Sequence, residues 1–234
     1  MSRRALIGLA AAALLAAAPS AGAAGPKIRQ MVVFRSGEAV TKVVRASRVL
    51  VRADGRRCAA GDGTALAALV RSRPGRLRLR DFGSCSRSPR DAGGLFVSAI
   101  GPDPNRGQNG WVYKVGRRSA TAGAADPLGP FGRGRLRAGQ RVTWFYCRLQ
   151  AGGCQRTLEV RASARTDGLV ATVRGYDDEG RGVAIEGARV SAGGASVLTA
   201  ADGTARLPLP TGSHRVVASK AGLVRSFAER VEVP

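Results

Sequence analysis

Short apolar runs separated by turn residues set the strongest limit on the fold of this chain. Between residues 30 and 53 the runs are only two to four residues long, and Asp54-Gly55 follows them as a turn signal. Valine-rich runs of this length are typical of β-strands. Further strands are expected at 76–80, 95–100, 110–115 and 141–147. The chain is therefore predicted to be mainly β.

One segment of the first half departs from the strand pattern. Residues 65–70 are continuously apolar, and Thr64 or Asp62 can serve as the N-cap of a helix. Pro74-Gly75 closes the segment. We expect one short helix there, which makes the first domain an α+β unit.

The second half of the chain has a more regular spacing of short apolar runs. Residues 163–168 show no apolar pattern, and turn residues then separate short runs at 169–176, 188–191, 196–199, 204–209, 213–219 and 224–233. Many short strands at regular spacing indicate a sandwich of two sheets. We expect two domains, 26–162 and 168–234, joined by a linker at 163–167.

The first 23 residues have the features of a signal peptide. Arg3 and Arg4 precede an apolar stretch at 5–18, and Ala21-Gly22-Ala23 provides the small residues of a cleavage site. The stretch is shorter than the ~20 residues that span a bilayer, although a retained N-terminal anchor is the alternative. No later segment is long and apolar enough to span a membrane. We expect a secreted or envelope-associated protein outside the cytoplasmic membrane.

An exported chain with four cysteines is expected to form two disulfides. Cys58, Cys85, Cys147 and Cys154 allow three pairings. Proximity along the chain favours Cys147 with Cys154, because Gly152-Gly153 between them can fold back. Cys58 and Cys85 would then join the start of the helix to a later loop. A metal site is the alternative, but no CxxC spacing exists and the only histidine is distant, so we expect no bound metal.

Positive charge is concentrated in the first domain. The formal net charge is +22; residues 26–167 hold 28 basic and nine acidic residues, whereas 168–234 hold eight and seven. Codon bias alone should not separate the two halves of one chain so sharply. Alternation along 76–80 places Arg76, Arg78 and Arg80 side by side on an outer face.

These three arginines are the candidate anion-binding residues. Guanidinium groups pair with phosphates and carboxylates, so an exported protein could bind teichoic-type polymers, anionic lipid headgroups or acidic polysaccharide. Export argues against nucleic acid as the physiological partner. The alternative is charge that serves solubility alone.

Four aromatic residues share one face of two expected strands. They are Trp111, Tyr113, Trp144 and Tyr146. Such a face could stack on sugars or bases. We favour a core position under the helix at 65–70, because large aromatic side chains are usually buried.

No group of residues predicts catalysis, and we expect neither an enzyme nor a cofactor. His214, the only histidine, lies within an expected strand, where a structural role is favoured. The acidic turn Asp177-Asp178-Glu179 lacks the alternating oxygen ligands of a calcium loop, so we expect a solvated turn.

The first domain resembles a bacterial domain related to the C-terminal domain of transcobalamin. The resemblance rests on the helix start at 63–69, the segment 97–101, the strand Asn109-Gly110-Trp111-Val112-Tyr113-Lys114-Val115 and the segment 136–146. It implies a β-grasp-like sheet with one helix packed across it. Corrinoid binding is not carried over, since the domain has no histidine to coordinate cobalt and no helical barrel. It remains the less favoured alternative of a small-molecule binder.

The second domain resembles the carboxypeptidase regulatory-like sandwich, which has an Ig-like, transthyretin-type fold. The segments that carry this resemblance are 187–190, 202–205, 207–209, 212–218 and 220–222, with Thr199. Modules of this kind serve as stalks, spacers or interaction surfaces. We therefore expect an exported, non-enzymatic binding protein whose basic domain contacts anionic envelope polymers and whose second domain is a spacer. The alternative is a structural or adhesion protein that binds another exported protein.

Overall fold

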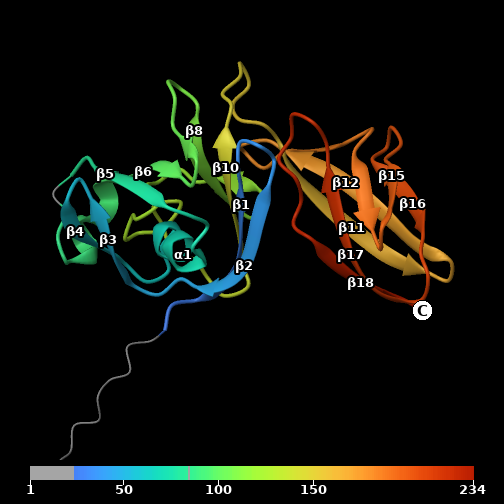
Figure 1. Ribbon diagram of the computed structural model, residues 1–234, viewed down its shortest axis with the longest axis horizontal. Coiled ribbons are helices and arrows are strands. Elements are labelled where there is room, and N and C mark those ends of the chain that lie inside the picture. Colours follow the sequence, from blue (N-terminus) through green and yellow to red (C-terminus); the bar gives the residue numbers. More distant parts are fainter. Residues whose placement is uncertain (1–23, 84) are drawn as a thin grey trace, which may run out of the picture.

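Figure 1 shows the computed structural model of the chain, in which residues 24–83 and 85–234 are described. The predicted signal peptide, 1–23, lies outside the described residues. The chain forms a first unit (residues 24–147), a connecting segment (148–156) and a second unit (157–234), and the two units lie side by side. The structure is mainly β with one short α-helix, as the sequence predicts.

A five-stranded mixed sheet forms the centre of the first unit. Its strand order is β2-β1-β10-β8-β9, and β1 runs parallel to β10 in the middle while the other neighbours are antiparallel. The β1–β2 hairpin comes first, and the connection that contains the helix follows. The antiparallel pair of β8 and β10 then adds to the free edge of β1, which is the β-grasp arrangement. The strands are β1 (Lys27–Val33), β2 (Ala39–Arg45), β8 (Gly110–Val115), β9 (Arg118–Ser119) and β10 (Arg141–Cys147).

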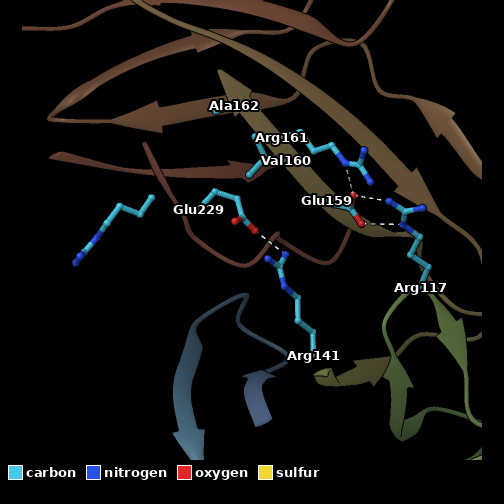
Figure 2. Close-up of a pocket in the computed structure, with 8 residues that line it drawn as sticks. Arg117, Arg141, Glu159, Val160, Arg161, Ala162 and Glu229 are labelled. Atoms are coloured by element: carbon cyan, nitrogen blue, oxygen red, sulfur yellow. Dashed lines mark hydrogen bonds and ion pairs between the residues drawn. The ribbon is translucent and has the colours of Figure 1, made fainter. Parts of the chain in front are cut away.

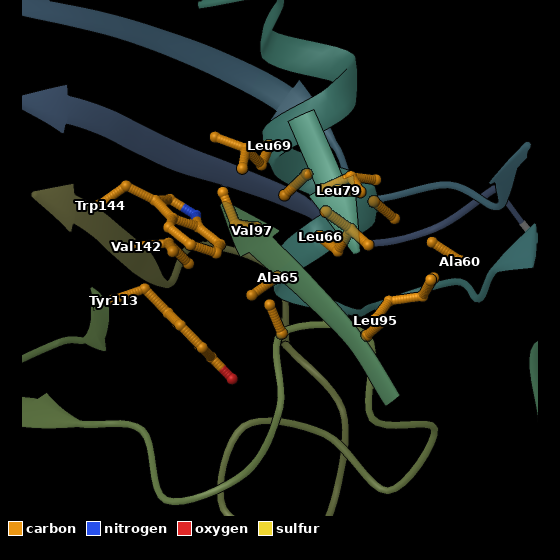
Figure 3. Close-up of a cluster of buried hydrophobic side chains, with 14 of the residues drawn as sticks. Ala60, Ala65, Leu66, Leu69, Leu79, Leu95, Val97, Tyr113, Val142 and Trp144 are labelled. Atoms are coloured by element: carbon orange, nitrogen blue, oxygen red, sulfur yellow. The ribbon is translucent and has the colours of Figure 1, made fainter. Parts of the chain in front are cut away.

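Helix α1 (Ala65–Ser72) packs across one face of this sheet. The side chain of Thr64 accepts a hydrogen bond from the backbone N–H of Ala67 at 3.2 Å, which makes Thr64 the N-cap. The helix ends at Arg73, whose left-handed backbone (φ 47°) allows its N–H to bond back to Val70. Leu66 and Leu69 are completely buried between the helix and the strands, as Figure 3 shows.

Two smaller sheets complete the first unit on the helix side. A hairpin forms from β3 (Val49–Ala53) and β4 (Arg56–Ala60), and a second sheet has the order β5-β6-β7. The elements of that part are β5 (Leu77–Asp81), β6 (Leu95–Ile100), β7 (Asp103–Pro104) and the 3₁₀-helix η1 (Pro89–Gly94). Strand β4 escapes sequence analysis because it begins with two arginines and contains no branched apolar residue.

The second unit is a sandwich of two four-stranded sheets. Buried side chains of both sheets, among them Val160, Val173 and Val190, meet in one core. One sheet contains β11 (Thr157–Arg165), β12 (Gly168–Tyr176), β13 (Gly182–Ala184) and β16 (Thr204–Pro208). The other contains β14 (Arg189–Ala192), β15 (Ala195–Leu198), β17 (Gly212–Ser219) and β18 (Glu229–Val233).

The predicted linker at 163–167 is wrong. Strand β11 extends to Arg165 and pairs along its whole length with β12, from Thr157 opposite Tyr176 to Arg165 opposite Gly168. Alanines at 162 and 164 take the inward positions there, so the apolar alternation is too weak to read from sequence. The units are joined instead by residues 148–156. With this boundary, 24–156 hold 26 basic and seven acidic residues and 157–234 hold ten and nine, so the charge contrast persists.

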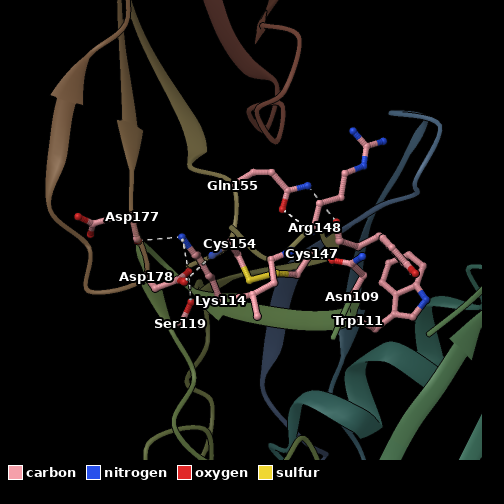
Figure 4. The surroundings of a disulfide bond; sticks show 12 residues. Asn109, Trp111, Lys114, Ser119, Cys147, Arg148, Cys154, Gln155, Asp177 and Asp178 are labelled. Carbon is pink, nitrogen blue, oxygen red and sulfur yellow. Dashed lines mark hydrogen bonds and ion pairs between the residues drawn. A yellow bond between two sulfur atoms is a disulfide. The ribbon is translucent and has the colours of Figure 1, made fainter. Parts of the chain in front are cut away.

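Both predicted disulfides are confirmed, Cys58–Cys85 and Cys147–Cys154. Cys58 lies within β4, however, and not at the start of the helix as expected. Its bridge ties the β3–β4 hairpin to the loop after β5. The second bridge joins the end of β10 to the connecting segment (Figure 4). Across the described ranges, 24–83 and 85–234, no helix has the length and apolar character needed to cross a bilayer.

Candidate anion-binding groove and the contact between the units

The three arginines predicted to bind anions line one groove. Along β5, Arg78 and Arg80 are exposed while Leu79 is buried, and Arg76 is exposed just before the strand. The groove has a volume of about 520 Å³ and is also lined by Arg52, Asp54, Phe82, Phe96, Ser98 and Asn105. We call it the arginine groove. Its volume lies in the range of small-molecule sites, ≈ 300–1,000 Å³.

Hydrogen bonds to the backbone hold the floor of this groove. The Ser98 hydroxyl donates to the carbonyl of Arg78 at 3.0 Å, which pins β6 to β5 beside a shift in their register. The Asn105 amide donates to the carbonyl of Val97 at 3.0 Å. Asp54 accepts the N–H of Asp81 at 2.9 Å, which ties the β3–β4 turn to the end of β5. The guanidinium groups therefore extend from an ordered backbone.

The cationic side chains of the groove lack protein partners. Among the residues that the structure describes, the guanidinium groups of Arg52, Arg76, Arg78 and Arg80 make no hydrogen bond or ion pair. The nearby carboxylate of Asp81 is already occupied, since Arg56 lies 3.6 Å from it. Asp54 is the one carboxylate in the lining, so four guanidinium groups face a single negative charge. The groove is strongly cationic.

Two phenylalanines add an apolar surface that the sequence analysis missed. Phe82 is 72% exposed and Phe96 is 43% exposed, and their ring centroids lie 5.8 Å apart at a 60° tilt. Phe96 pairs with Arg80 across the two strands. Alternation could have located Phe96, because Leu95 and Val97 on either side face the core. Phe82 follows the end of β5, where alternation no longer applies.

The four aromatics of β8 and β10 are buried and form no exposed stacking surface. Each is at most 7% exposed. Tyr113 stacks on Trp144 at 4.9 Å, and Trp111 meets Tyr146 edge to face at 5.9 Å. The Trp111 N–H and the Tyr113 and Tyr146 hydroxyls donate to backbone carbonyls. Burial raises the pKa of Tyr113, and the charge of Asp126 adds to this shift.

The opposite face of the central sheet packs against the second unit. Residues of β1 and β10 that point away from α1, including Met31, Val33 and Phe145, form a small apolar cluster with Val224 and Phe227. Arg29 and Arg141 lie over the Phe227 ring at 5.5 and 5.6 Å. The sheet is therefore covered on both faces.

Lys114 is the buried polar centre of this contact. It points from β8 toward the second unit, is completely buried, and donates to the carbonyls of Tyr176 at 3.1 Å and Asp177 at 2.8 Å. Its ammonium also lies 3.3 Å from the carboxylate of Asp178. Figure 4 shows this group beside the Cys147–Cys154 bridge. All three ammonium protons thus face an acceptor.

The charge states of this pair follow from burial and hydrogen bonding. Burial lowers the pKa of Lys114, and the charge of Asp178 partly offsets that effect. Burial pushes the pKa of Asp178 upward, but donors from the Cys154 backbone and the Ser119 hydroxyl, together with Lys114, outweigh it and lower the pKa. The solvated turn expected at 177–179 is therefore wrong for Asp178. The carboxylate serves the contact between the units.

A second polar network lines a cleft of about 460 Å³ between the units (Figure 2). Arg117 donates two hydrogen bonds to Glu159, at 2.8 and 2.6 Å, and Arg161 donates a third at 2.9 Å. Arg141 lies 2.5 Å from Glu229. The hydrogen bond from Arg117 is the main cause that lowers the pKa of Glu159. These arginines already have carboxylate partners, unlike those of the arginine groove.

Among the residues that the structure describes, no group of three or more His, Cys, Asp or Glu side chains is placed to hold a metal ion. Asp177 is engaged by Arg181 at 3.2 Å and Arg156 at 3.7 Å. The imidazole Nε2 of His214 lies 2.7 Å from the carbonyl of Pro210, within the second unit.

In comparisons with known proteins, no family model, no curated protein and no solved structure matches this chain.

Proposed function

We propose that this protein is an exported binding protein that holds an anionic polymer of the cell envelope in its arginine groove. The observation that carries the proposal is the presence of four guanidinium groups without protein partners in one concave site. Guanidinium groups make bidentate, charge-assisted hydrogen bonds to carboxylates and phosphates. Because hydrogen bonds already fix the backbone at the floor of the groove, binding has to order fewer groups of the protein, which favours affinity.

Two further observations support export and a role in binding. Disulfides persist in oxidising compartments outside the cytoplasm, and this chain contains two. The carboxylates Asp178 and Glu159, whose pKa values are lowered, are engaged in contacts between the units and not in the groove. We therefore assign these carboxylates to the contact between the units and the groove to binding. In addition to acting as a spacer, the second unit then supports the central sheet of the first unit, which is the unit that contains the arginine groove.

The two family resemblances enter the proposal as expectations of fold. A transcobalamin-related β-grasp domain followed by a carboxypeptidase regulatory-like sandwich is consistent with the strand orders described above. Neither resemblance supplies the ligand, which we infer from the arginine groove alone.

The test is retention of the chain 24–234 on isolated cell envelopes across a salt series. The intact chain is used because a cut at the predicted linker, 163–167, would separate β11 from its partner strand β12. The variant R76Q/R78Q/R80Q is compared with R45Q/R133Q/R137Q, which loses the same charge at exposed positions outside the groove. Affinity should fall steeply with salt, and the groove variant should lower the slope of log K against log salt by about 2–3.

The control variant should retain most of the binding. Equal weakening of both variants would show that net charge acts diffusely and would overturn the proposal. Retention that is independent of salt would favour the alternative, a specific contact with another exported protein.

A further inference from the structure

We infer that the polymer in the arginine groove is an acidic polysaccharide whose sugar residues carry carboxylates. This inference rests on the proposed function and deepens it. The groove combines three chemical features in one place: guanidinium groups, exposed phenyl rings and hydrogen-bond acceptors. A ligand that uses all three must offer anionic groups, apolar faces and hydroxyl donors.

The phenyl rings separate this ligand from polymers that carry only phosphate. Phe82 and Phe96 are among the large exposed apolar residues of the chain, and they contact each other at the groove. An exposed apolar cluster inside a polar site is typical of a ligand-binding groove. Because Phe96 stands opposite Arg80 on the neighbouring strand, one sugar residue can place its C–H face on the ring and its carboxylate on the guanidinium.

The acceptors of the groove fit hydroxyl donors. One carboxylate oxygen of Asp54 accepts the N–H of Asp81, which leaves the other oxygen available. The Ser98 hydroxyl donates its proton to the carbonyl of Arg78 and retains capacity to accept. A carboxylate repels a purely anionic ligand but accepts hydrogen bonds from sugar hydroxyls. Asp54 therefore favours a carbohydrate over polyphosphate.

The shape of the site argues against two other anionic ligands. A flat bilayer surface cannot enter a concave groove of about 520 Å³. The planes of the two phenyl rings are tilted by 60° to each other, so two stacked, parallel bases cannot both lie flat on them. Single-stranded nucleic acid is therefore an outcome of the test and not the proposal.

The experiment is calorimetric titration of the chain 24–234 with four probes at fixed ionic strength. The probes are hexagalacturonate, its full methyl ester, a polyphosphate of matching charge and an oligothymidylate. The variants are R76Q/R78Q/R80Q, F82A/F96A and the control L128A/L198A, which truncates exposed leucines outside the groove. Unchanged melting temperatures establish that each variant is folded.

Hexagalacturonate should bind. Its methyl ester should not bind, because esterification removes the negative charges of the carboxylates while it keeps the sugar rings. F82A/F96A should weaken hexagalacturonate binding about tenfold and leave polyphosphate binding within about twofold, since only the sugar uses the phenyl rings. L128A/L198A should bind every probe as the unmodified chain does.

Two results would overturn the inference while the proposed function stands, provided that binding still depends on the three arginines. The first is unchanged hexagalacturonate binding by F82A/F96A. The second is tighter binding of oligothymidylate than of hexagalacturonate. If R76Q/R78Q/R80Q binds every anionic probe as well as the unmodified chain does, the proposed function fails as well.

Discussion

The ammonium of Lys114, in the first unit, lies 3.3 Å from the carboxylate of Asp178, in the second. Lys114 is completely buried, and two backbone carbonyls of the second unit complete its hydrogen bonds. A lysine is rarely fully buried unless it is paired. The pair therefore binds the two units to each other, and its loss should affect both.

Replacing Lys114 by methionine should destabilise the protein by about 3 kcal/mol, the lower end of the range for losing one partner of a buried pair. The lower end applies because Asp178 keeps its donors from Ser119 and Cys154. Urea denaturation measures the change. K42M, at an exposed position on β2, should stay within ±0.5 kcal/mol of the unmodified protein. A loss below 1 kcal/mol for K114M would show that the pair is dispensable.

Truncating Phe227 should separate the unfolding of the two units. Its ring fills the apolar cluster between them, lies beneath Arg29 and Arg141, and is only 7% exposed. F227A should cost about 3–5 kcal/mol, as for other buried phenylalanines. Scanning calorimetry should show one transition for the unmodified chain and two for the variant, whereas L198A keeps one transition. A single, unshifted transition in F227A would contradict this prediction.

Acid should weaken the contact between the units through Glu159. Its pKa is lowered in the folded protein, first by the hydrogen bond from Arg117, so the unfolded chain binds the proton more tightly. The stability that Glu159 contributes is fully present when the pH is above the ordinary glutamate pKa of ≈ 4.3. It is lost as the pH falls through the lower pKa that Glu159 has in the folded protein. Asp178 acts in the same direction.

The free energy of unfolding should therefore be nearly constant from about pH 5 to 8 and fall below about pH 4. E159Q should be less stable at neutral pH by about 1.5–3 kcal/mol and should show a shallower decline in acid, because its side chain no longer titrates. E38Q, at an exposed position, serves as the control. Parallel pH profiles for E159Q and the unmodified chain would exclude this role of Glu159.

The two disulfides should differ in their contribution to stability. Their cysteines are 27 and 7 residues apart. Chain entropy then predicts that C58S/C85S costs about 3.5 kcal/mol and C147S/C154S about 2.5 kcal/mol. Urea denaturation of the two double variants gives the comparison. The reverse order would mean that the position of Cys147–Cys154 beside Asp178 matters more than the length of the loop it closes.

Local features of the sequence were sufficient for much of the fold. The continuous apolar run at 65–70, preceded by the candidate N-caps Thr64 and Asp62, predicted helix α1, because capping and helix initiation depend on a few neighbouring residues. The structure selects Thr64. Alternation predicted most strands, and the spacing of Cys147 and Cys154 favoured the correct disulfide pairing. The exposed arginines of β5 followed from the same alternation.

Only the tertiary structure decided which residues meet across long separations. Strand β11 has a weak apolar pattern and exists through its pairing with β12 and its place in the sandwich core. Phe82 and Phe96 come together because β5 and β6 are neighbours. Lys114 would be solvated on an isolated sheet, and it is buried because the second unit covers that face. Alternation determines which face of a strand a side chain occupies, whereas long-range packing determines what covers that face.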